Sequence, residues 1–286
     1  MSRAFLISVL TVFSLALAWA DEKPNANLKV QYDKISNYHN TETGEPIQSV
    51  NKFILQVAPS MSYFYDPQTY YIDSLEHDPN GKALLRQIEE DSYKEYQRTK
   101  TDPFEYLKKL GMLRNQRYKC LKDFNAGMIT VWDSDMGDKY RYPVEIEDLQ
   151  WDLTDSVKTV LGYECQLATA VYHGRRWYVW FAPEIAVQDG PWQLCGLPGL
   201  IMEAAADDDS YRFVATGLQS CDEPLKDPYE DDKYFITKRI PFLKMKDYSQ
   251  RNRSAKISAM TGGKVNLKGG ADYKGTDDFL ETDYHE

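Results

Sequence analysis

The side chains best suited to bind a ligand lie on and beside a predicted strand at 176–181. Arg175 and Arg176 stand at its start, and the planar arginine fork can clamp the anionic end of a ligand. Trp177 and Trp180 on this strand, and Trp192 after it, have large rings that could line a concave surface for a lipid or a peptide. These five residues are the candidate ligand-binding residues.

The same residues also have structural roles that are more frequent in proteins. A salt bridge to Glu164 or Glu184 would account for the arginine pair, and sheet packing would account for the rings. The sequence leaves both roles open.

A catalytic or metal-binding constellation is not recognisable. The four histidines, His39, His77, His173 and His285, lie far apart in sequence, and His173 beside Gly174 is expected to face solvent. No serine has the Gly-x-Ser-x-Gly context, and no Cys–His pair stands out. The acidic run 207–209 predicts a solvated turn, because calcium loops alternate their ligands. We therefore predict no metal and no cofactor, and a role without catalysis.

Four cysteines suggest two disulfides if the chain folds in an oxidising compartment. A hairpin centred on Asp208 would place Cys195 opposite Cys221, which leaves Cys120 to pair with Cys165. The alternative is free buried thiols. No cysteine pair has zinc-finger spacing.

The net charge and the composition of the first twenty residues indicate which partners are excluded and where the protein is located. The formal net charge is −10, which argues against nucleic-acid partners and against docking on anionic lipid. Residues 1–20 are typical of a secretory signal peptide: Arg3, an apolar stretch and the cleavage site Ala18-Trp19-Ala20. We expect a periplasmic or secreted protein with no stable membrane insertion after cleavage.

The stretch 190–203 combines three glycines and two prolines with large apolar residues. Leu197-Pro198-Gly199-Leu200 predicts a type II turn, in which Gly199 would adopt a positive φ. This mixture indicates a buried chain reversal that leads into a strand, and it offers no nucleophile. The residues that we assign to this structural motif are Gly190, Pro191, Gly196, Leu197, Pro198, Gly199, Leu200 and Ile201.

The hexapeptide 196–201 resembles the signature of the GLPGLI family, which is named after it. The resemblance extends over about seventy residues, through Trp151, 162–166, 174–177, 180–185 and 190–192. It implies a secreted protein of Bacteroidetes-type bacteria, and it assigns no reaction and no catalytic residue.

The predicted fold is mainly β (α+β). We expect a curved antiparallel sheet or half-open barrel with a helical insert at 80–110 and a C-terminal helix. Residues 21–260 would form one domain, and 261–286 would form a flexible tail. Strands are expected at 28–31 and 53–57, and Tyr70-Tyr71-Ile72 is interpreted as an extension of this N-terminal β region. Strands at 165–172 and 176–181 would be joined by a reversal at His173-Gly174. A bent sheet under a helical lid resembles periplasmic lipoprotein carriers, which is a likeness of fold alone.

These observations favour a non-enzymatic envelope protein that binds a hydrophobic ligand or a partner segment on a concave, aromatic-rich sheet. One alternative is an accessory protein that interacts with an outer-membrane transporter. Another is a hydrolase whose site assembles from distant residues.

Overall fold

The computed structural model describes residues 24–39, 44–100, 103–112, 114, 116–226, 228–229, 233–252 and 279–285. The strands are β1 (Asn25–His39), β2 (Pro46–Val57), β3 (Met61–Tyr65), β4 (Lys119–Asp123), β5 (Met128–Asp135), β6 (Asp138–Glu145), β7 (Asp152–Val160), β8 (Tyr163–Tyr172), β9 (Arg175–Ala182), β10 (Leu200–Ala206), β11 (Tyr211–Pro224) and β12 (Phe235–Ile236). The helices are α1 (Pro67–His77), α2 (Pro79–Thr99), α3 (Pro103–Lys109) and α4 (Arg239–Arg251), with a 3₁₀ turn at Asp283–His285.

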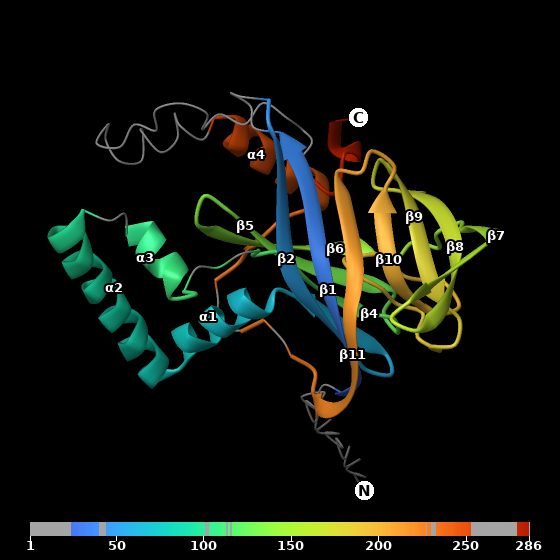
Figure 1. Cartoon of the computed structure of the whole chain (residues 1–286), viewed down its shortest axis with the longest axis horizontal. Coiled ribbons are helices and arrows are strands. Elements are labelled where there is room, and N and C mark those ends of the chain that lie inside the picture. The colour runs from blue at the N-terminus through green and yellow to red at the C-terminus, as the bar shows by residue number, and fades with distance from the viewer. Residues whose placement is uncertain are drawn as a thin grey trace, which may run out of the picture.

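All of these strands belong to one sheet with the order β12-β6-β5-β4-β3-β2-β1-β11-β10-β9-β8-β7. Neighbouring strands run antiparallel, except that the two residues of β12 pair in parallel with β6. The sheet bends without closing, and β4 to β6 cross behind β1 and β2 in Figure 1. The predicted mainly β fold with a curved, largely antiparallel sheet is therefore confirmed.

The inner side of the bent sheet holds the main hydrophobic core. Side chains alternate between the two faces of a strand, so Val30 and Tyr32 of β1 and Phe53 and Leu55 of β2 all point inward and are buried. The segment between β9 and β10, residues 183–199, crosses this inner side. Its Trp192 packs on Trp177 of β9, with ring centroids 5.4 Å apart. The core therefore joins strands that are not neighbours in the sheet.

The helical insert begins earlier than the sequence predicts. The Asp66 carboxylate caps α1 by accepting from the Thr69 amide at 2.8 Å, and Pro67 occupies the first turn. Residues 70–72, expected to be extended, are therefore helical. The three helices α1, α2 and α3 extend away from the sheet (Figure 1). Within the described residues, no helix has both the length and the apolar character that a membrane span needs.

The C-terminal region has two described parts. The predicted helix is present as α4, which lies over one end of the sheet. The predicted tail lies mostly outside the described residues, but residues 279–285 are described and pack on the protein. Phe279, Glu281 and Tyr284 are buried there, so this last stretch differs from the loose tail that its composition suggested.

The two predicted disulfides are wrong, because all four cysteines are free in the structure. The hairpin that would align Cys195 with Cys221 does not extend that far. Only residues 203–205 of β10 pair with β11, and Cys195 lies in the inner crossing segment. Cys221 instead lies beside Ala26, whose carbonyl oxygen accepts from the Cys221 thiol at 3.4 Å. Cys120 of β4 donates to the Trp192 carbonyl at 3.2 Å.

Candidate functional site

The concave side of the sheet encloses a cavity of about 350 Å³ between β1, β2, β5, α4 and residues 279–281. Its inner wall consists of buried core side chains. Phe53, Phe64, Phe213 and Tyr142 contribute their rings, and Trp192 of the crossing segment completes the wall. The cavity thus lies at the border between the packed core and the open half of the bent sheet.

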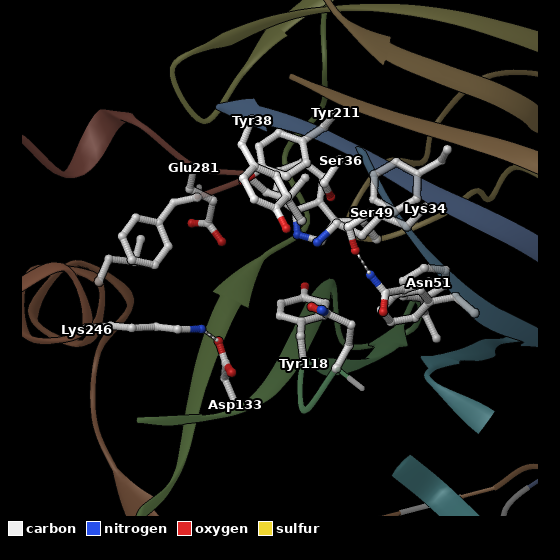
Figure 2. A pocket seen from close by; sticks show the side chains of 18 of the residues that line it. Lys34, Ser36, Tyr38, Ser49, Asn51, Tyr118, Asp133, Tyr211, Lys246 and Glu281 are labelled. Carbon is white, nitrogen blue, oxygen red and sulfur yellow. Dashed lines mark hydrogen bonds and ion pairs between the residues drawn. The ribbon is translucent and has the colours of Figure 1, made fainter. Parts of the chain in front are cut away.

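The outer part of the cavity is polar because the inward-facing residues of β1 and β2 change character along each strand. On β1, the inward positions continue after Tyr32 as Lys34, Ser36 and Tyr38. On β2, Asn51 and Ser49 line the cavity where the apolar inward residues end. These residues keep the two-residue period of a strand but are only half-buried, and several point into the cavity in Figure 2.

The charged groups of the cavity wall are paired within the protein. Lys246 Nζ of α4 donates to Asp133 Oδ2 of β5 at 2.6 Å, as Figure 2 shows. Glu281 accepts from Arg239 at 2.6 Å, and Lys34 Nζ lies 5.2 Å from the centre of the Tyr211 ring. The wall therefore contains two lysines and two carboxylates, and neither sign of charge dominates.

The C-terminal segment forms one side of the cavity and is held by residues distant in sequence. Arg239 donates to both carboxylate oxygens of Asp283, at 2.8 and 2.6 Å. The Thr282 amide donates to the His173 carbonyl at 2.9 Å, and His173 Nδ1 lies 3.4 Å from Asp283 Oδ2. Desolvation opposes ionisation of Asp283, but the bonds from His173 and Arg239 outweigh it and hold its pKa below the usual range.

His173 is consequently buried rather than solvent-facing, which corrects the sequence prediction. Its two-residue turn with Gly174 forms as expected, with positive φ at both positions. The turn is covered by residues 282 and 283, because a Cβ at Gly174 would lie 2.3 Å from Thr282 Oγ1. His173, Glu281 and Asp283 offer ligand atoms within 4.8 Å of one another. The guanidinium of Arg239 forms ion pairs with both carboxylates of this group, those of Glu281 and Asp283.

The predicted arginine clamp does not face the cavity. Arg175 is buried and binds Asp208, the Ser210 hydroxyl at 2.9 Å and the Phe279 carbonyl at 2.9 Å. Neither of the two glutamates suggested by the sequence is its partner. The acidic run 207–209 forms the predicted solvated turn, and its Asp208 also binds Arg175. Arg176 is exposed on the other side of β9.

Of the three candidate tryptophans, only Trp192 lines the cavity. Trp177 is fully buried in the core. Trp180 lies in the half-exposed position of β9, where Lys158 Nζ is 4.5 Å from its ring. The alternation along β9 separates these two rings onto opposite faces.

A fully buried lysine of the sheet holds the crossing segment in place. Lys122 of β4 is 0% exposed, forms an ion pair with Asp189, and donates to the carbonyls of Gly190 and Leu194 at 2.8 and 3.2 Å. Burial alone would lower the pKa of this ammonium group, but the Asp189 carboxylate holds it above the usual value. The pair positions the segment that carries Trp192.

Glycines let the same segment pack against the sheet. A Cβ at Gly199 would lie 2.3 Å from the Ala182 carbonyl oxygen, and one at Gly190 would lie 2.7 Å from Ile201 Cβ. Gly199 has no positive φ, so the predicted type II turn is wrong. Its amide instead donates to the Leu197 carbonyl at 2.8 Å across Pro198, and the positive φ belongs to Gly196.

Two buried thiols, Cys120 of β4 and Cys195 of the crossing segment, are suited to packing rather than to nucleophilic chemistry. Burial raises the pKa of the Cys120 thiol to about 12 and that of the Cys195 thiol to about 11. Both remain protonated at neutral pH, and a protonated thiol is a poor nucleophile.

Comparisons with known proteins identify no relative by sequence: no family model and no curated protein matches the chain. Two solved structures of PNGF-II, in different crystal forms, resemble it with a TM-score of 0.48 at 10% and 12% identity. The alignments cover 79% of this chain but 34% and 33% of those chains. The chain thus spans about a third of the length of these structures.

Proposed function

We propose that this chain is a secreted, non-enzymatic binding protein that holds a small amphipathic ligand in the cavity on the concave side of its sheet. The observation that carries the proposal is the wall itself. Core rings such as Phe53 and Phe213 form one part, and hydroxyl and amide groups such as those of Ser36 and Asn51 form the other. A site of this kind buries the apolar part of a ligand and orients its polar part.

The size of the cavity limits the ligand. About 350 Å³ lies near the lower end of the range for small-molecule sites, which is roughly 300–1,000 Å³. One short apolar chain with one polar head would fill it. A long lipid would have to leave much of its surface outside.

The test uses N-phenyl-1-naphthylamine, an uncharged dye whose emission rises in an apolar environment. Ser49→Trp would fill the cavity, whereas Val50→Trp places the same ring one residue away on β2, at a position that is 53% exposed. We expect wild type and Val50→Trp to bind the dye and Ser49→Trp to lose at least about tenfold in affinity, or 1.4 kcal/mol. Equal binding by both variants, each with a wild-type circular dichroism spectrum, would refute the proposal.

The proposal also includes the cellular location of the protein and its family. A signal peptide at 1–20 and membership of the GLPGLI family would place the mature protein in the periplasm or outside the cell. Amino-terminal sequencing of the exported protein should begin at Asp21. A mature chain that retains Met1 would contradict this address.

One observation favours a second function, an interaction with an outer-membrane transporter. The insert leaves apolar side chains of α2 uncovered, with Tyr93 63% and Leu84 42% exposed. A photo-crosslinker at Tyr93 should capture one predominant membrane protein in intact cells if this second function is correct. A crosslinker at the exposed Lys52 of β2 is the control, and equal labelling at both positions would count against this interaction.

A further inference from the structure

The charges around the cavity indicate what kind of polar group its ligand carries. A ligand with an anionic end would need a cation that is not already neutralised, yet Arg175 and Arg239 both bind carboxylates of the protein itself. Within the wall, Lys246 is paired with Asp133, and Lys34 is held over the Tyr211 ring, with its Nζ 5.2 Å from the ring centre. An added charge on the ligand would have to replace one of these contacts or be buried without a partner, and either outcome is costly.

Uncharged polar groups, by contrast, are plentiful and come from different elements. Ser36 of β1, Asn51 of β2 and Gln250 of α4 line the cavity together with Gln116, which lies before β4. Hydroxyls and amides both donate and accept hydrogen bonds. A ligand with several hydroxyl groups matches such a wall, because each of its hydroxyls can find both a donor and an acceptor.

We infer that the ligand combines an uncharged, polyhydroxylated head with a short apolar tail. This inference rests on the proposed function, because it specifies the ligand of the same cavity. The polar half of β1 and β2 would hold the head, and the rings of the inner wall would hold the tail.

The experiment compares probes that differ in one property at a time, as competitors of the bound dye in the full mature chain. Octyl β-glucoside has both parts, methyl β-glucoside has only the head, and 1-octanol has only the tail with one hydroxyl. Octanoate and octylammonium carry a charge on the same tail. All probes are used below the concentrations at which they form micelles.

Octyl β-glucoside should displace the dye with an inhibition constant at least about tenfold lower than that of any of the other four probes. Asn51→Leu should reduce this preference over 1-octanol by about fivefold or more. Gln48→Leu, the same kind of change at an exposed position of β2, should leave it unchanged.

Other outcomes separate the two claims. Tighter binding of octanoate or octylammonium, or equal binding of 1-octanol and the glucoside, would overturn the inference while the dye still confirms the cavity. A glucoside preference that survives Asn51→Leu would also overturn it. Failure of the dye itself to bind would refute the proposed function.

Discussion

The inner crossing segment 183–199 and the polar end of the β1–β2 pair contrast in how they use the same concave space. The crossing segment carries the most conspicuous sequence of the chain, yet it is packed solid, with Gly199 against the Ala182 backbone and Asp189 on a buried lysine. The polar end of the β1–β2 pair has no distinctive sequence motif, yet its Ser36 and Asn51 line the cavity. The distinctive sequence of the crossing segment thus reflects the close packing of its backbone, and the candidate ligand site lies beside it, at the polar end of β1 and β2.

This contrast predicts that the crossing segment is essential for folding. Lys122→Met removes one partner of a fully buried ion pair and should lower the free energy of unfolding by about 3–5 kcal/mol. Urea denaturation at pH 7 measures it. Lys246→Met, which breaks a pair at the edge of the cavity, should cost less. A smaller loss for Lys122→Met than for Lys246→Met would remove the contrast.

The same lysine also predicts a dependence on alkaline pH. Its pKa is raised in the folded protein, so its contribution is complete below about pH 10.4, the unfolded value, and disappears as pH rises through the folded value. Burial raises the pKa of Tyr32 and Tyr142 as well, and these phenols destabilise the fold in the same window. The difference in stability between wild type and Lys122→Met should therefore shrink above about pH 10. A constant difference from pH 8 to 12 would contradict this assignment.

A glycine comparison sharpens the contrast further. Gly199→Ala forces a Cβ against backbone and should cost about 3 kcal/mol. Within the described residues, a Cβ at Gly217 of β11 would meet nothing closer than the Gln31 side chain at 3.7 Å, so Gly217→Ala should change stability by less than about 1 kcal/mol. Thermal unfolding followed by circular dichroism compares the two. Equal midpoints would show that close packing of the crossing segment is not required.

A smaller effect is expected where the C-terminal segment closes the cavity. Arg239→Gln leaves the buried Glu281 without its ion-pair partner and should cost about 2 kcal/mol. Hydrogen exchange of the Thr282 amide should accelerate in this variant, while exchange in β8 stays slow. Because the pKa of Asp283 is lowered in the folded protein, its contribution is present above about pH 4 and is lost as pH falls further. Unchanged Thr282 exchange in the variant would contradict this account.

The smallest effect on folding is expected at the polar end of the cavity. Ser36→Ala should change the free energy of unfolding by less than about 0.5 kcal/mol, because the side chain is half-buried at the edge of the core. The affinity for octyl β-glucoside should nevertheless fall. A loss of stability as large as that of Gly199→Ala would make this end part of the folding core.

The sequence predicts the architecture well where apolar residues alternate and where turns carry glycine. The strands on either side of His173-Gly174 are examples, since β8 and β9 both form there. It predicts β1 and β2 only in part, at Leu28–Gln31 and Phe53–Val57, because the inward positions of β1 after Tyr32 and of β2 before Phe53 are mostly polar. The residues that shorten the predicted strands are those that line the cavity, so the missing apolar pattern was itself the signal of the site.

Contacts between distant segments were beyond prediction from one sequence. Arg175 binds the Phe279 carbonyl across 104 positions, and His173 is buried by the end of the chain. The cysteine pairing failed for a related reason: it assumed that β10 and β11 stay paired to Cys195, whereas β11 continues along β1. Composition and periodicity carry no information on such choices of partner.

The most direct test of the cavity follows the indole N–H signals of the tryptophans by nuclear magnetic resonance while N-phenyl-1-naphthylamine is added. Trp192 lies in the cavity wall, and Trp180 lies on the opposite face of the sheet. Binding in the cavity predicts that the Trp192 signal shifts and the Trp180 signal stays in place. A shift of Trp180 with Trp192 unchanged would place the ligand elsewhere and contradict the account.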